Sequence, residues 1–239
     1  MKNTFVILAI ASIFISCTEA NQSNLEGSES TKQVTDNNLE FKAKQTSIYV
    51  IDTDFSKGRL TNKQEISLWD VQKMHGHLCD GLVVGFLGLR EGLFELYPDS
   101  IIDRTNTRIV SQSSPCIGDI GLYLTGGRYQ FNSFYIDENI EGVYVVQRID
   151  NGKAVSIQLK PGIKPALINI LGAKAVKNEL DACSLDSLRK MEDNFSHQLL
   201  KSNPKDLFKI KGLDNFHWQP VLKNDYKKTD VLNKNASKC

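Results

Sequence analysis

The chain has 239 residues, of which 41% are hydrophobic, so it is long enough for one large domain or two small ones with a real core. Lysine and arginine total 29 against 28 acidic residues, which leaves a formal net charge of +1. This balance gives no reason to expect nucleic acid or an acidic polymer as a partner. The function therefore has to be inferred from individual sites.

Residues 1–17 are predicted to be a targeting segment. Lys2 provides a positive start, and the apolar run Phe5 to Ile15 is too short to span a bilayer comfortably before Ser16 and Cys17 follow. The segment resembles a bacterial lipoprotein signal with Cys17 as the lipid acceptor; an ordinary signal peptide and an uncleaved anchor are the alternatives. A cysteine that closes the apolar run favours lipid attachment, so we expect an exported, membrane-anchored lipoprotein of the periplasm or cell envelope.

Residues 18–45 are rich in Asn, Ser, Glu, Gln, Thr and Lys, and are predicted to be a disordered tether. A folded domain is expected from 46 to 220, followed by a flexible tail over 221–239. An exported compartment would permit disulfides. The four remaining cysteines are spaced widely and irregularly, so we expect no structural disulfide among them: Cys79, Cys116, Cys183 and Cys239.

The domain begins with a predicted strand over 47–52, rich in Ile, Val and Tyr. A helix is predicted next, capped by Thr61 or Asn62 with Glu65 as the capping-box acid. Its apolar side chains would face the core and lead the chain to Met74. The most informative stretch of the sequence directly follows this predicted helix.

That stretch runs from His75 to Gly81, and it holds His75, His77 and Cys79 within five residues. Imidazole nitrogen and thiolate sulfur are the ligands that zinc and similar cations prefer. A continuous helix would turn His77 away from the other two, whereas a strand or a bent turn allowed by Gly76 would let all three converge. The alternative is two surface histidines beside a buried cysteine. The tight spacing favours a functional site built on metal or thiol chemistry.

Residues 82–96 are predicted to form the central buried helix, because apolar residues occur nearly all round it. Glycines recur along it at three- or four-residue spacing, at positions 81, 85, 88 and 92. Each glycine inside a helix costs up to about 1 kcal/mol relative to alanine. Their repetition therefore indicates close packing or a close ligand.

A strand over 108–111 is predicted to lead to a helix with Ser114 as its N-cap and Pro115 as its first residue. Cys116 would then lie in the first turn, where the helix dipole stabilises a thiolate. A buried cysteine at a strand–helix junction explains the same residues equally well. Asp119, one turn further, could orient a ligand, act as a base, or pair with the helix start.

The second half of the domain is predicted to contain an antiparallel sheet. Strands are expected over 131–136, 143–148 and 154–159, the last two joined by a hairpin turn at Asp150 to Lys153. Helices are predicted over 165–180 and 185–201, with His197 off the apolar stripe of the second. Residues 207–218 are expected to pack back on the domain. The predicted fold class is α+β, an antiparallel sheet packed against the central glycine-rich helix and flanking helices.

The quoted residues resemble FmdE, a family named after the formylmethanofuran dehydrogenase enzymes. Its HGHxCxG segment corresponds to residues 75–81, and its second segment, a cysteine, an Asp three residues later and a Thr-Gly turn, corresponds to Cys116, Asp119 and residues 125–126. The chain differs from the family in having Asp80 where Pro is common and Gly127 where a Cys follows the turn. It also lacks the paired-cysteine tail of some members.

The resemblance implies an α+β domain, a homodimer and a bound metal, most often zinc, although iron, nickel and copper stay open. His77 and Cys79 are then the expected core ligands, with Cys116 approaching and His75 or Asp119 completing the set. A site with three protein ligands would leave a position for water or a small-molecule substrate, with Asp119 as proton carrier or orienting group. Two alternatives remain: a thiol redox protein using Cys79 and Cys116, and a non-catalytic module that binds a metal or small ligand.

Overall fold

The computed structural model describes residues 46–53, 58–59 and 61–219. The predicted signal segment with Cys17, the predicted tether and the predicted tail 221–239 lie outside these residues. Mixed helices and strands confirm the α+β fold class. Within the described part of the chain, no helix has the length and apolar character needed to cross a bilayer.

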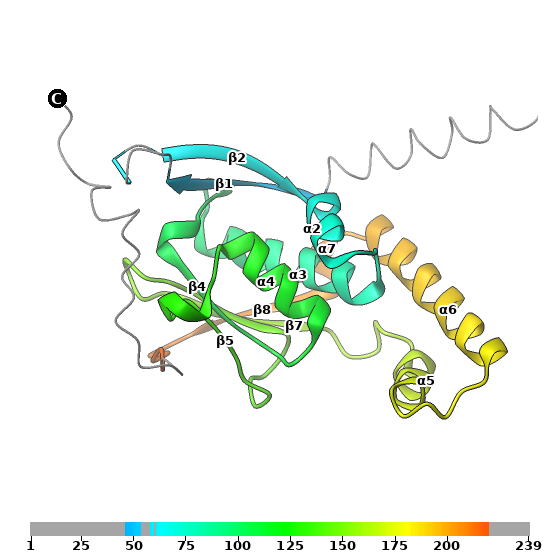
Figure 1. The fold of residues 1–239 in the computed structure, drawn as a ribbon. Coiled ribbons are helices and arrows are strands. Elements are labelled where there is room, and N and C mark those ends of the chain that lie inside the picture. The colour runs from blue at the N-terminus through cyan, green and yellow to red at the C-terminus, as the bar shows by residue number, and fades with distance from the viewer. Residues whose placement is uncertain (1–45, 54–57, 60, 220–239) are drawn as a thin grey trace, which may run out of the picture. The chain divides into compact units, whose positions relative to one another are not determined.

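A three-stranded sheet with the order β2-β1-β3 forms one side of the domain (Figure 1). β1 (Ser47–Thr53) pairs antiparallel with β2 (Thr61–Ser67) and parallel with β3 (Ile101–Asp103). Ile48 and Val50 of β1 are fully buried and attach this sheet to the core.

The helix predicted from Thr61 is wrong in its first half. Residues 61–67 form β2, because they pair in register with the whole of β1. Their side chains from Thr61 to Glu65 are exposed, so no apolar face was available to hold a helix there. Helix α2 (Leu68–His75) starts instead at Ser67, which forms a capping box with Asp70: Asp70 Oδ2 accepts from Ser67 N at 2.9 Å, and Ser67 Oγ accepts from Asp70 N at 3.3 Å.

Two helices lie between the two sheets (Figure 1). Helix α3 (Asp80–Leu96) is buried along most of its length and packs beside α4 (Pro115–Thr125). Both were predicted from sequence. The core is apolar and continuous around them, and its largest fully buried side chains are Tyr144, Phe86, Ile48, Leu68, Leu82, Leu89, Leu93, Ile102, Ile109, Ile120, Leu124 and Ile157.

The glycines of α3 are sites of close approach, as their spacing predicted. A Cβ atom at Gly85 would lie 2.8 Å from the hydroxyl of Tyr144, and one at Gly88 would lie 2.8 Å from the ring of Phe208. Such distances are below normal van der Waals contact, so side chains from the large sheet occupy the space that alanine would need. The glycines therefore let the sheet pack directly on the helix backbone.

The large sheet has the strand order β5-β4-β6-β7-β8. All of its pairings are antiparallel except that of β4 with β5. The strand predicted over 131–136 is shorter, since a 3₁₀ turn occupies 129–131. The hairpin predicted at 150–153 joins β6 to β7, and the segment predicted to pack back on the domain supplies the edge strand β8. The strands are β4 (Thr107–Ser111), β5 (Phe134–Ile136), β6 (Tyr144–Arg148), β7 (Ala154–Leu159) and β8 (Phe208–Leu213).

The remaining helices connect β7 to β8. They are α5 (Ala166–Val176), α6 (Ala182–Lys201) and the short α7 (Pro204–Leu207). Helix α6 buries Leu188, Phe195 and Leu199 against the domain, and it packs along α3. His197 is exposed, off this stripe as predicted.

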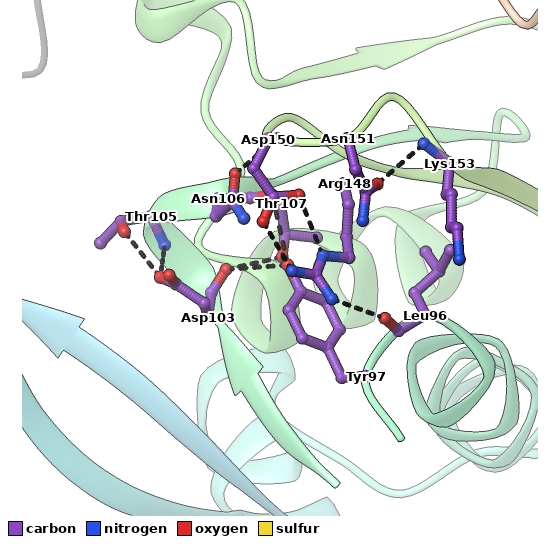
Figure 2. A network of polar contacts seen from close by, with 10 residues as sticks. All are labelled: Leu96, Tyr97, Asp103, Thr105, Asn106, Thr107, Arg148, Asp150, Asn151 and Lys153. Atoms are coloured by element: carbon purple, nitrogen blue, oxygen red, sulfur yellow. Dashed lines mark hydrogen bonds and ion pairs between the residues drawn. The ribbon is translucent and has the colours of Figure 1, made fainter. Parts of the chain in front are cut away.

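A polar network closes the far end of α3 (Figure 2). The hydroxyl of Tyr97 lies 2.8 Å from Thr107 Oγ1 and also contacts the carbonyl oxygens of Asp103 and Asn106. Arg148 donates to the carbonyl of Leu96 at 3.0 Å, and its guanidinium lies over the Tyr97 ring. The network ties the end of α3 to β4 and to the hairpin after β6.

Candidate metal centre

The loop between α2 and α3 is a sharp bend. Gly76 ends α2 in the left-handed conformation, with φ of 99°, which a residue with a side chain adopts only at a cost. Cys79 then caps α3, its Sγ accepting a hydrogen bond from the backbone N–H of Leu82 at 3.4 Å. Of the three conformations that the sequence allowed, the structure adopts the bent turn entering a helix.

Cys116 reaches the same place from the first turn of α4. Ser114 occupies the N-cap position and Pro115 the first helical position, as predicted, although the Ser114 side chain makes no capping hydrogen bond. The Sγ atoms of Cys79 and Cys116 lie 3.3 Å apart, with the Cys79 thiol donating to Cys116. Two residues 37 positions apart thus form one sulfur pair. Cys183 is free and exposed on α6.

His75, the last residue of α2, completes the group. Its Nδ1 lies 2.7 Å from Oδ2 of Asp119, and its side chain is only 8% exposed. Its other ring nitrogen, Nε2, is buried and has no hydrogen-bond partner. The ligand atoms of His75, Cys79 and Cys116 all lie within 4.8 Å of one another.

His77 lies outside this group. Its side chain is exposed, and its ring lies against that of His75 at a tilt of 39°, with 4.7 Å between the centroids. The bend at Gly76 thus brings His75 to the sulfur atoms and leaves His77 on the surface side. The expectation that His77 is a core ligand stays a prediction, which the substitution His77→Ala tests.

The hydrogen bond between the two cysteines shifts their pKa values in opposite directions. Because the Cys79 thiol donates to the Cys116 sulfur, the pKa of Cys116 is lowered to about 7, and burial opposes this shift. The same hydrogen bond, together with burial, raises the pKa of Cys79 well above its ordinary value. In the metal-free protein one thiolate therefore resides mainly on Cys116 near neutral pH.

A gap over the sulfur atoms is kept open by Gly81. A Cβ atom there would lie 3.0 Å from Cβ and 3.1 Å from Sγ of Cys116, and 3.8 Å from Sγ of Cys79. Any residue with a side chain would press on the sulfur pair. The glycine of the HGHxCxG segment thus has a steric role at the group.

The three residues suit a transition metal. Two cysteine sulfurs and one imidazole nitrogen are a donor set of catalytic zinc sites, which keep a fourth position for water or substrate. The buried Nε2 of His75 lacks a partner, and a metal would satisfy it. Asp119 holds the other nitrogen of the ring, as carboxylates do for histidine ligands. The arrangement therefore fits a metal ion.

A pocket of about 430 Å³ adjoins the group. The residues that form its outer wall were not predicted from the sequence. His77, Leu78 and Cys79 line one side, and α6 lines the other with Arg189, Glu192 and Asp193. The available signal was the edge of the apolar stripe of α6, where Glu192 lies four residues after Leu188. Nothing in the sequence indicated which element that edge faces.

No curated protein matches this chain significantly. The model of a protein family described as FmdE, Molybdenum formylmethanofuran dehydrogenase operon, matches residues 74–209. This range contains every residue of the candidate metal centre and also helices α5 and α6, beyond the part on which the resemblance rested. The match covers more than half of the chain, and the chain belongs to the FmdE family.

Proposed function

We propose that this protein binds a transition metal, zinc in the first place, through His75, Cys79 and Cys116, and acts on a small molecule there. The observation that carries the proposal is the buried Nε2 of His75, which has no hydrogen-bond partner in a residue whose ligand atom lies within 4.8 Å of those of Cys79 and Cys116. A bound zinc ion would supply Lewis acidity and an open coordination position. Asp119 orients His75 by accepting from Nδ1.

The test is the metal content of the protein purified without chelator, measured by mass spectrometry together with free thiols. We expect near-stoichiometric metal in the wild type and in Cys183→Ser, whose cysteine lies outside the group. Cys79→Ser, Cys116→Ser and His75→Ala should lose it. His77→Ala should keep it, and loss of metal in that variant would make His77 a ligand instead. A wild type without metal would refute the proposal.

A second function is favoured by the 3.3 Å separation of the two sulfurs. The thiolate of Cys116 would attack a substrate disulfide and release one thiol, and Cys79 would then attack the mixed disulfide and release the second. The products are two substrate thiols and a Cys79–Cys116 disulfide. Metal-free protein in which these two cysteines are oxidised to each other would support this function.

For location, we propose that the chain is exported and anchored through a lipid on Cys17. The support is the sequence of residues 1–17, a positive start and an apolar run closed by cysteine. Incorporation of labelled palmitate into the wild type and not into Cys17→Ser would support the anchor, and equal labelling of both would refute it.

For assembly, we propose a homodimer that uses α5. Leu167, Ile170 and Val176 of this helix are 51%, 54% and 86% exposed, while Ile168 is buried in the domain. A helix that is apolar all round is normally covered on all sides, and a second copy would cover the exposed part. Sedimentation of the wild type as a dimer and of Ile170→Glu as a monomer would support this assembly; a monomeric wild type would refute it.

A further inference from the structure

The pocket beside Cys79 is where a small molecule held at the metal centre would extend. Cys79 belongs both to the pocket wall and to the metal group. The opposite wall is α6, whose three lining side chains are charged. A ligand that reaches from the sulfur group across the pocket therefore meets Arg189, Glu192 or Asp193.

Of the carboxylates around this pocket, two are already paired. Asp80 is buried, and its Oδ2 lies 2.8 Å from Nζ of Lys164. Asp193 lies 4.0 Å from Nε of Arg189 one turn before it on α6. Among the residues that the structure describes, none forms an ion pair or a hydrogen bond with the Glu192 carboxylate. Glu192 thus has no ion-pair partner of its own in the described part of the chain, since the nearby Lys164 is paired with Asp80.

The environment of Glu192 disfavours the charged form of its carboxylate. The residue lies at the edge of the buried stripe of α6 and is half-buried. Burial raises the pKa of Glu192, and the negative charges of Asp80 and Asp193 add to the rise, while Lys164 opposes it. A cation brought next to this carboxylate would relieve an unfavourable local charge.

Arg189 does not supply that cation. Its side chain is 82% exposed, and its contact with Asp193 joins two solvated groups, so this pair contributes little. The charges of the lining side chains sum to −1, from Arg189 against Glu192 and Asp193. The pocket therefore favours a positive group over a negative one.

We propose that this pocket binds the protonated amine end of a small-molecule ligand, with Glu192 as the carboxylate that receives it and the other end of the ligand at the metal centre. The proposal rests on the proposed function, which supplies the metal-bound end. Independently, Nε2 of His75 is buried without a hydrogen-bond partner, which indicates that the group beside this pocket binds a further ligand. The inference assigns a substrate class, small primary amines, and a specificity-determining residue.

The experiment compares three thiols of matched length on the zinc-loaded full chain: 2-aminoethanethiol, 2-mercaptoethanol and mercaptoacetate. Each offers a thiol sulfur to the metal, and the other end is a cation, a neutral hydroxyl or an anion. An amine or a carboxylate can also chelate zinc, so the same series on a variant without the Glu192 charge separates the contact with the protein from chelation. We expect calorimetric titration to give the tightest binding for the amine, about three- to tenfold tighter than for the alcohol, and the weakest for the carboxylate. Equal affinities, or tightest binding of mercaptoacetate, would overturn the proposal.

Glu192→Gln is the decisive variant, because it keeps the size of the side chain and removes its charge. We expect it to lower the preference for the amine over the alcohol by about three- to tenfold, the contribution of the Glu192 charge. Asp186→Asn is the matched control, since Asp186 is an exposed acid on the same helix and does not line the pocket. It should keep the wild-type order. An unchanged order in Glu192→Gln would overturn the role of this residue.

Failure of the metal site can be separated from failure of this inference. The zinc content of each sample is measured before titration. If the wild type holds no zinc, 1,4-diaminobutane is titrated instead and followed by NMR shifts of α6, since this probe needs no metal. Shifts near Glu192 that vanish in Glu192→Gln would support the amine pocket without the metal, and no shift at all would overturn it.

Discussion

His75 and Asp119 lie 44 positions apart in sequence, and yet Nδ1 of the histidine is 2.7 Å from Oδ2 of the aspartate. This contact joins the end of α2 to the first turns of α4. It sets the ring orientation of His75, so that Nδ1 carries the proton and the buried Nε2 is left as the free ligand atom. The geometry of the metal centre thus depends on a residue that need not touch the metal.

Asp119→Asn is expected to weaken metal binding without unfolding the domain. An amide keeps the shape of the side chain but loses the charge that holds the histidine N–H, and such losses typically cost about 10- to 100-fold in metal affinity. Competition with a chromophoric zinc chelator measures the change. Asp214→Asn, an exposed acid beyond β8, serves as control. Equal affinities of Asp119→Asn and the wild type would mean that the contact has no role at the metal.

Gly81→Ala is expected to damage the site by crowding alone. The added methyl group would lie 3.0 Å from Cβ of Cys116 and 3.1 Å from its Sγ, so Cys116 has to shift, which disturbs the spacing of the two sulfurs. We expect roughly tenfold weaker metal binding, which corresponds to about 1.4 kcal/mol. Gly172→Ala in α5 is the control, because no atom lies within 4 Å of its added Cβ. Gly172→Ala should keep the wild-type metal affinity. Wild-type metal affinity in Gly81→Ala would show that a side chain at this position does not disturb the site.

In the metal-free protein, Cys116 is expected to react with iodoacetamide as a thiolate from about neutral pH upward. The hydrogen bond from Cys79 lowers the pKa of Cys116 to about 7, so its alkylation rate should rise through that pH. Cys79→Ala removes the donor, and the rise should move to higher pH. Peptide mass spectrometry of Cys116 at a series of pH values follows the rate. An identical profile in both proteins would show that the sulfur contact is not formed.

Tyr97 is expected to make the fold sensitive to alkaline pH. Burial raises its pKa from 10.0 to about 12, so the unfolded chain loses this proton at a lower pH than the folded one. The stabilisation from the neutral phenol is complete below pH 10 and is lost as the pH rises through 12, about 3 kcal/mol in all. Urea unfolding at a series of pH values measures it.

Tyr97→Phe should remove most of this alkaline loss. It should also be less stable at pH 7, by about 0.5–1.5 kcal/mol, because the contacts of the Tyr97 hydroxyl with Thr107 and two carbonyls are lost (Figure 2). The loss is modest because Thr107 Oγ1 still donates to the carbonyl of Asp103, and the carbonyl of Asn106 still accepts from the backbone N–H of Ile149. Tyr49→Phe is the control, since the Tyr49 side chain is 45% exposed. The same pH dependence in Tyr97→Phe as in the wild type would assign the alkaline loss to other groups.

Local sequence patterns were sufficient for much of the fold. The buried helix α3, the start of α4 at Ser114 and Pro115, and the hairpin at residues 150–153 were all predicted, because each depends on side chains within a few positions of one another. The cluster of His75, His77 and Cys79 was recognisable for the same reason. When suitable donor atoms lie within five residues, the entropic cost of closing the loop between them is small.

Long-range contacts decided the remainder. Residues 61–67 are a strand because β1 pairs with them, and their local capping signals could not compete with seven paired positions. The direction of the bend at Gly76 and the carboxylate of Asp119 together bring His75, rather than His77, to the two cysteines. Glu192 faces Cys79 across a pocket only because α6 packs along α3. The sequence by itself determined that histidine and cysteine ligands are present. The tertiary structure decided which of these side chains lie together, because the neighbours of a side chain across the fold are set by packing between distant elements.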